Sequence, residues 1–295
     1  MVPGVMLSGH TDVVPVDGQL WTKPPFEAVV ESGRVYGRGT ADMKGFVAAA
    51  LSCAGIAAQR HLQTPLQTPL HLALSYDEEI GCVGVRSLID MLAAAPVKPA
   101  MCIVGEPTAM AIATGHKGKT AIEAACVGSA AHSALAPQAV NAIHLACDLI
   151  AQIRHLQDDM ITDGAQDSAY DIPYTTLHAG LITSGVALNI VPDHAVVTFE
   201  IRNLAADDPE AILRRLRRAI APVIAVARKR AAEADIVFKV INSYPGLETS
   251  LDEAVVAMVA ELTGRDERIK VAFGTEGGLF SQRLGIPAVV CGPGS

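Results

Sequence analysis

The stretch VMLSGHTDVVP, residues 5–15, joins a run of apolar residues to a histidine and an aspartate that stand two positions apart. The apolar run is short, as is typical of a strand buried in an α/β sheet. His10 and Asp12 follow where this strand passes into a loop. In open α/β sheets, ligands bind at the carboxyl ends of the strands. The stretch therefore predicts an α/β fold with polar residues gathered at one edge of its sheet.

Segments further along the chain, near both of its ends, continue this pattern. Short apolar runs at 70–76, 101–104 and 288–291 are predicted strands, and the alanine-rich run 43–58 is a predicted helix. Short strands that alternate with helices indicate an α/β layer with buried strands.

The pattern changes near Gly118, where longer strands with alternating burial begin. The predicted strands are 119–128, 175–184, 194–203 and 234–241, and the predicted helices are 141–156 and one that opens at Pro209. Their order, β-α-β-β-α-β, is that of a ferredoxin-like module. After this module the chain returns to helix and buried strand. We therefore expect a discontinuous α/β domain, residues 1–114 and 245–295, with a second domain inserted at 115–244.

The composition excludes several classes of protein. Of the 295 residues 50% are hydrophobic and 18% are charged, as in a globular chain, and the net charge of -8 argues against a nucleic-acid partner. The longest apolar run, 46–58, is shorter than the ~18 residues that suggest a membrane span, and no signal-peptide pattern is present. The six cysteines are scattered without a C-x-x-C pair, so we expect buried thiols in a reducing compartment. These features favour a cytoplasmic protein without a membrane partner.

Several segments bring histidine or acidic residues to the ends of predicted strands or to a helix start. These residues are His10 with Asp12, Asp42, the pair Glu78 and Glu79, and Glu106. Each alone has an ordinary structural explanation, such as a helix cap or a solvated loop. Acids crowded at one sheet edge would repel each other and raise each other's pKa, and a divalent cation removes this cost. Nitrogen and carboxylate ligands suit zinc, manganese or cobalt better than calcium.

Five motifs, SGHTDVVP, GRGTADMKG, DEEIG, GEPT and GTEGGLF, resemble the successive motifs of the M20 family of zinc peptidases and deacylases. The resemblance covers almost the whole chain and keeps the family order. It implies a metal-binding α/β domain with an inserted ferredoxin-like lid domain, through which the chain would form a homodimer. The segments DMKGFVAAAL, ALNIVPD and CGPGS are most similar to the members that remove the acetyl group from N-acetyl-L-ornithine in arginine biosynthesis.

The resemblance implies metal-binding roles at matching positions. Asp42 would bridge two metal ions, His10 and Glu106 would complete the protein ligands of the first ion, and Glu79 would hold the second. The implied cofactor is Zn²⁺, one or two ions per subunit, with Co²⁺ as an alternative. Asp12 would orient His10 through its far ring nitrogen. The other histidines match no ligand motif and are interpreted as structural.

The resemblance also implies catalytic and substrate-binding roles. Glu78 would be the general base, which takes a proton from water and delivers it to the leaving amine. His132 of the lid would reach the other subunit's active site and stabilise the oxyanion. Four further residues would contact a small N-acyl amino acid as substrate. They are Asn189 and Arg202 of the lid, where Arg202 could pair with a carboxylate, and Gly274 and Thr275 of the catalytic domain.

Two alternatives to this amide hydrolase remain open at the level of sequence. One is another hydrolase of the same family, such as a succinyl-diaminopimelate desuccinylase, an aminoacylase or a carboxypeptidase. The other is a non-catalytic or impaired protein. The His-x-Asp motif lies only a few residues after Met1, and the chain stops at Ser295, before the position of the family's final metal-binding histidine. We therefore expect a chain truncated at both ends, with a weakened second metal site and impaired catalysis.

Overall fold

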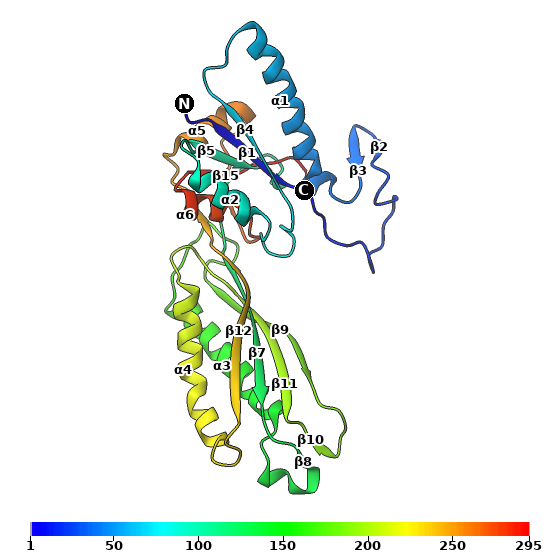
Figure 1. Ribbon diagram of the computed structural model, residues 1–295, viewed down its shortest axis with the longest axis vertical. Helices are drawn as coiled ribbons and strands as arrows, with labels where there is room; N and C mark the ends of the chain where they lie inside the picture. Colours follow the sequence, from blue (N-terminus) through cyan, green and yellow to red (C-terminus); the bar gives the residue numbers. More distant parts are fainter. Residues whose placement is uncertain (1, 295) are drawn as a thin grey trace. The chain divides into compact units, whose positions relative to one another are not determined.

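The computed structural model describes residues 2–294 and divides into two compact units. Figure 1 labels their helices and strands. The first unit consists of Met1–Lys117 and Tyr244–Ser295, and the inserted unit is Gly118–Ser243. The predicted domain boundaries lie next to these limits. Met1 and Ser295, the outermost residues of the predicted first domain, lie outside the described residues.

The first unit is built on a seven-stranded sheet in which four neighbouring strands run parallel. In spatial order these four are β4 (Leu70–Ser75), β1 (Val5–His10), β5 (Met101–Val104) and β15 (Ala288–Val290). The sheet continues through β6 (Ile112–His116), which pairs with β13 (Leu247–Glu248) and β14 (Arg268–Val271). The central strands are almost completely buried, which explains their continuous apolar runs.

Helices cover both faces of this sheet. On one face, α2 (Val85–Ala94) and α6 (Gly277–Leu284) bury Ile89 and Phe280 against Met6 of β1. On the other face, α5 (Ala254–Thr263) buries Val255 against β5 and β15. Two further elements, α1 (Gly45–Gln63) and the hairpin of β2 (Val29–Glu31) and β3 (Arg34–Tyr36), lie between β1 and β4 in the chain.

The predicted helix from Met43 begins later, at Gly45. It is preceded by a π-helical turn, η1 (Thr40–Lys44), in which Asp42 and Met43 have non-helical backbone angles, φ -116° and ψ 95° for Asp42. Thr40–Gln63 is long and apolar enough, by length and composition alone, to cross a membrane. Within α1, Val47 and Ala50 are buried in the first unit.

The inserted unit has its main elements in the predicted β-α-β-β-α-β order. Its four-stranded sheet has the spatial order β12 (Asp235–Tyr244), β7 (Lys119–Val127), β11 (His194–Arg202) and β9 (Thr176–Ser184). The two helices are α3 (Ala142–Thr162) and α4 (Pro209–Ala227). A two-residue pair of β8 (Ala131–His132) with β10 (Ile190–Val191) and a 3₁₀ turn, η2 (Ser133–Gln138), complete the unit.

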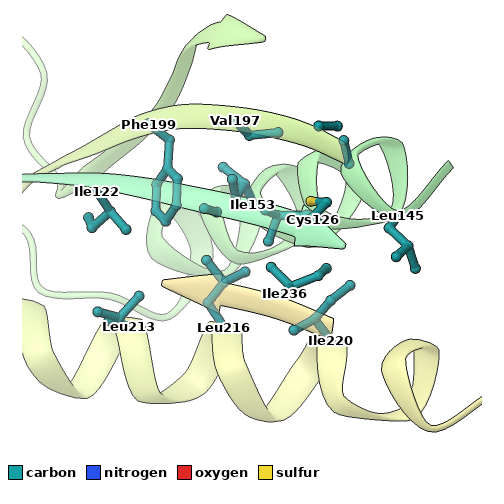
Figure 2. Packing of buried hydrophobic residues seen from close by; sticks show 14 of the residues in the cluster. Ile122, Cys126, Leu145, Ile153, Val197, Phe199, Leu213, Leu216, Ile220 and Ile236 are labelled. Atoms are coloured by element: carbon teal, nitrogen blue, oxygen red, sulfur yellow. The ribbon is translucent and has the colours of Figure 1, made fainter. Parts of the chain in front are cut away.

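The core of the inserted unit lies between one face of its sheet and the two helices (Figure 2). Alternate residues of β7 and β11, such as Ile122 and Phe199, point toward the helices, because side chains alternate between the faces of a strand. Leu213 and Leu216 of α4 pack against them. Asp208 caps α4 by accepting a hydrogen bond from Glu210 N at 2.9 Å.

All six cysteines are free thiols, and four of them are buried as predicted. The prediction is wrong for Cys53 and Cys147, which are exposed. Both lie on the outer faces of helices, α1 and α3, which a local apolar run does not distinguish from inner faces.

Candidate metal centre

Three adjacent parallel strands bring polar residues to the same edge of the first unit's sheet. His10 is the last residue of β1, Glu78 and Glu79 follow β4, and Glu106 follows β5. The strands are in register, with His10 opposite Ser75 at the end of β4. Since carboxyl ends of parallel strands lie at one edge, the sequence separation of these residues disappears in the fold.

His10, Asp42 and Glu106 form a compact group of potential metal ligands. His10 Nε2 lies 3.0 Å from Asp42 Oδ1 and 3.5 Å from Glu106 Oε1. One ligand atom from each of the three residues lies within 4.8 Å of the others. A zinc ion binds nitrogen and oxygen at about 2.0–2.2 Å, so ligand atoms about 3–4 Å apart can share one ion. The donor set and its spacing therefore fit a divalent cation of the zinc type.

Asp12 holds both His10 and the loop after β4. His10 Nδ1 lies 3.0 Å from the main-chain oxygen of Asp12 and 3.3 Å from its Oδ1. Asp12 Oδ2 accepts a hydrogen bond from Glu79 N at 3.0 Å. Asp12 thus lies at the far ring nitrogen of His10, and its main-chain carbonyl is the nearer of its two oxygens. Donation from Nδ1 leaves Nε2 directed at Asp42 and Glu106, as a metal ligand requires.

Gly105 allows helix α1 to pack directly behind Glu106. A Cβ atom at Gly105 would lie 1.9 Å from Cγ of Phe46, so no larger residue fits without displacing that ring. The turn before α1 carries Asp42, and the peptide bond between Asp42 and the buried Met43 is cis. The close approach of Phe46 to Gly105 thus accompanies the arrangement in which Asp42 and Glu106 both lie near His10 Nε2.

The charges of the group compensate one another. Burial opposes the charged form of His10, but hydrogen bonds to Asp42 and Glu106 outweigh this and raise its pKa to about 11. The hydrogen bond from His10 lowers the pKa of Asp42. Burial raises the pKa of Glu106, although His10 opposes this shift. The two carboxylates thus hold a positive charge between them, which a cation bound to neutral His10 could supply.

Glu78 and Glu79 differ in their surroundings although they are neighbours. Glu78 is only 9% exposed, and the Cys82 thiol donates a hydrogen bond to its Oε1 at 3.2 Å. Burial, with a contribution from the charge of Glu106, raises the pKa of Glu78 to about 8. Glu79 accepts a hydrogen bond from Val14 N at 3.2 Å, and burial together with Asp42 raises its pKa. Among residues 2–294, Glu79 does not belong to the compact ligand group.

The GTEGG motif lies at the start of α6, and its glutamate was not selected from the sequence. A Cβ atom at Gly274 would lie 2.2 Å from the ring of Tyr244, and Thr275 Oγ1 accepts a hydrogen bond from Gly277 N at 3.0 Å. Glu276 is 1% exposed and accepts a hydrogen bond from Ser8 Oγ at 3.1 Å. An acidic residue inside a predicted site motif was the available signal.

His116 fits the structural role expected of it. It is completely buried at the end of β6, and burial lowers its pKa to about 4. Its Nδ1 donates to Lys117 O at 3.0 Å, and its Nε2 accepts a hydrogen bond from Gly278 N at 3.2 Å. Neutral His116 therefore connects β6 to the N-terminus of α6.

The three residues selected from the inserted unit occupy two places within it. His132 pairs with Ile190, and Ser133 N donates to Asn189 O at 2.9 Å, so His132 and Asn189 lie close together. Arg202 ends β11, a nine-residue strand that begins near them, which separates it from them by roughly 25 Å. Arg202 Nε donates to Glu200 Oε1 at 3.0 Å. The inserted unit therefore does not bring all three together.

Known proteins resemble the chain over nearly all of its length. The model of the peptidase family M20/M25/M40 matches residues 6–295. An acetylornithine deacetylase of Salmonella heidelberg (strain SL476) is 34% identical over 293 residues, which cover 99% of this chain and 72% of that protein. Two solved structures share the fold. A tripeptidase of Staphylococcus aureus has a TM-score of 0.67 at 24% identity, with 99% of this chain and 72% of that chain covered. A dinuclear metal-binding M20 peptidase of Bacillus subtilis has a TM-score of 0.68 at 17% identity and the same coverage.

Proposed function

Because this chain belongs to the peptidase family M20/M25/M40, we propose that it is a metal-dependent hydrolase that removes the acetyl group from N-acetyl-L-ornithine, a step of arginine biosynthesis. The observation that carries the proposal is the His10–Asp42–Glu106 group beside buried Glu78. The 34% identity to an acetylornithine deacetylase supports the choice of substrate. The six free cysteines support a reducing compartment, the cytoplasm.

The metal ligands on this proposal are His10, Asp42 and Glu106. A bound zinc ion supplies Lewis-acid chemistry, because it polarises a carbonyl oxygen and makes water more acidic. Co²⁺ suits the same nitrogen and carboxylate donors. Glu79 would hold a second ion together with Asp42, a role supported by the dinuclear metal binding of the Bacillus subtilis relative. Asp12 keeps the His10 ring in position during the reaction.

Glu78 would move the proton in this reaction. Its carboxylate takes a proton from the attacking water while the water oxygen bonds to the amide carbon. The C–N bond then breaks, and Glu78 gives the proton to the leaving amine nitrogen. Burial suits Glu78 to this role, because it raises the pKa of the carboxyl group from its ordinary value toward neutral pH.

The inserted unit would act as a lid and form a homodimer. The sheet edge at β9 carries the exposed apolar residues Leu181 and Ile182, 68% and 51% exposed, which supports a partner at this edge. On the family resemblance, His132 stabilises the oxyanion in the other subunit's site, and Asn189 and Arg202 bind the substrate. The guanidinium of Arg202 suits a substrate carboxylate, since it can donate two parallel hydrogen bonds.

Hydrolysis of N-acetyl-L-ornithine by the purified chain tests the main proposal. We expect release of ornithine in the presence of zinc or cobalt and none in the presence of a chelator. N-succinyl-diaminopimelate, measured under the same conditions, separates the nearest rival activity. Faster hydrolysis of the succinyl substrate would show that the chain is a desuccinylase and not a deacetylase. The proposal would be contradicted if the folded protein hydrolysed neither substrate in the presence of metal.

Mixing two inactive variants tests the role of His132 across subunits. Glu78→Gln removes the base and His132→Ala removes the lid histidine. In a mixed dimer, one site has both an intact Glu78 and an intact His132 from its partner. Equal mixing should therefore restore about a quarter of the wild-type rate, because half of the dimers carry one such site. If activity is not restored although the mixed dimers form, His132 does not act across subunits.

A further inference from the structure

Glu276 is a buried carboxylate that the proposed reaction does not use. It stands directly before α6 and is 1% exposed. Its Oε2 accepts the hydrogen bond from Ser8 Oγ at 3.1 Å, and Ser8 is itself completely buried. Burial raises the pKa of this carboxylate, and the side chains of Ser75 and Ser8 oppose that shift.

Ser8 and His10 point to the same face of β1, because side chains two residues apart in a strand share a face. Two residues along a strand correspond to roughly 7 Å, so Glu276 lies beneath the ligand group, with Ser8 between. Its carboxylate interacts electrostatically with both His10 and Glu106. Glu276 therefore adds a negative charge to the metal centre from inside the fold without reaching the ligand atoms.

An ionised carboxylate in the interior is costly unless hydrogen bonds and positive charge compensate it. Salt and water screen the interaction between buried charges only weakly. A cation held by His10, Asp42 and Glu106 can therefore provide this compensation without touching Glu276. The attraction acts in both directions. A charge that the cation stabilises must also stabilise the bound cation.

We propose that Glu276 is a positioning residue whose negative charge, placed beneath His10 through Ser8, strengthens cation binding by the His10–Asp42–Glu106 group. The proposal rests on the metal site of the proposed function. It assigns Glu276 no contact with the substrate or the ion. Its effect lies in the charge, and the hydrogen bond from Ser8 only fixes where that charge stands.

Calorimetric titration with Zn²⁺ tests this in the wild type, Glu276→Gln and Ser8→Ala. Burial raises the pKa of Glu276 to about 7, so the titrations are made at pH 8, where the carboxylate is mostly ionised. Glu276→Gln keeps the shape but removes the charge, and should weaken zinc binding about tenfold or more. Ser8→Ala removes a hydrogen bond that lowers the pKa of Glu276 but keeps the carboxyl group, and should weaken zinc binding clearly less than Glu276→Gln does.

Two results overturn the proposal. One is a zinc affinity of Glu276→Gln equal to that of the wild type, and the other is an equal loss in Ser8→Ala. Glu276→Asp, which keeps the charge, gives a second test should Glu276→Gln fail to fold. It should retain the wild-type affinity within a few-fold, and a tenfold loss again contradicts the proposal. If the wild type itself does not bind zinc, the metal site of the proposed function fails instead.

Discussion

The two units of the molecule differ in what they bury. Among the described residues, every buried Glu, His or Lys lies in the first unit. These residues are His10, Glu78, Glu106, His116, Lys117 and Glu276. In the inserted unit the buried polar residues are Thr120, Thr175 and Asn203, and a single apolar cluster fills its interior. Burying charge costs free energy and is typical of functional sites, whereas an apolar core stabilises a fold. The comparison therefore assigns the chemistry to the first unit.

The largest expected effect comes from the base in the first unit. Glu78→Gln keeps the shape of the side chain but cannot accept a proton, so kcat for the amide substrate should fall by about a thousandfold. Zinc affinity should also fall, because the buried Glu78 carboxylate interacts electrostatically with His10, so kcat is compared at saturating zinc. Steady-state kinetics with saturating zinc measure kcat, and calorimetric titration measures the zinc affinity. Asp77→Asn, in the same motif, is the matched control and should keep most of the activity. A Glu78→Gln enzyme with a tenth of the wild-type rate would contradict the role of Glu78.

The core of the inserted unit should affect stability without affecting the metal. Phe199 is almost completely buried, and Phe199→Ala should lower the free energy of unfolding by about 3–5 kcal/mol. Urea unfolding measures this change, and zinc titration of the folded variant should give the wild-type affinity. Phe26→Ala, at a residue 70% exposed, is the control and should cost less than about 1 kcal/mol. Loss of zinc binding in folded Phe199→Ala would show that the two units are not independent.

The metal-free first unit should become less stable as pH rises. The pKa values of Glu78 and Glu276 in the folded protein, about 8 and about 7, lie above 4.5, the ordinary value of the glutamate side chain. The folded state therefore holds more protons than the unfolded state between these values, and stability falls from pH 5 to pH 8. The pKa of His10 is raised to about 11, so His10 also makes the folded protein less stable as pH rises above 6.5.

Hydrogen exchange in the presence of chelator can measure this effect in each unit separately. From pH 6 to pH 8, peptides from β1 and β5 should lose more than about 1 kcal/mol of opening free energy after correction for intrinsic exchange. Peptides from β7 and α3 should lose less, because no buried Glu, His or Lys is found among the described residues of their unit. Glu78→Gln should reduce the loss in the first unit. A first unit that is more stable at pH 8 than at pH 6 would contradict the charge arrangement.

The smallest expected effect concerns the thiol beside the base. Cys82 Sγ donates to Glu78 Oε1, so Cys82→Ala should lower kcat about fivefold with little change in KM, because one weak hydrogen bond to the base is lost. Cys82→Ser restores a donor and should recover most of the rate. If the serine variant is as slow as the alanine variant, the hydrogen bond does not support catalysis.

Local sequence signals were sufficient to predict the main elements of the inserted unit, several strands of the first unit and the strand ends that carry His10, Glu78 and Glu106. They did not indicate α2, the hairpin of β2 and β3, or strands β6, β13 and β14. Alternation of apolar residues indicates strands, and polar residues after short apolar runs indicate their carboxyl ends. The turn at Asp42 was predicted as a helix start, because its non-helical angles depend on the packing of α1. That packing also requires Gly105, which no local pattern indicates.

The position of Glu276 in the GTEGG motif was a signal, but its burial against Ser8 could not be predicted, because Ser8 is 268 positions away in the chain. Burial of this kind depends on how α6 docks on the sheet, and no periodicity within GTEGG indicates it. The same limit applies to Asp12, where the choice between its main-chain and side-chain oxygens as partner of His10 depends on the course of the loop.

Zinc titration of the wild type, His10→Ala and His61→Ala tests the central claim most directly. His10 is the buried histidine of the ligand group, whereas His61 is exposed near the end of α1 and serves as the control. We predict saturable binding by the wild type and by His61→Ala, and a loss of affinity of about a hundredfold or more in folded His10→Ala. Equal affinity in the wild type and His10→Ala would contradict the metal centre at the edge of this sheet.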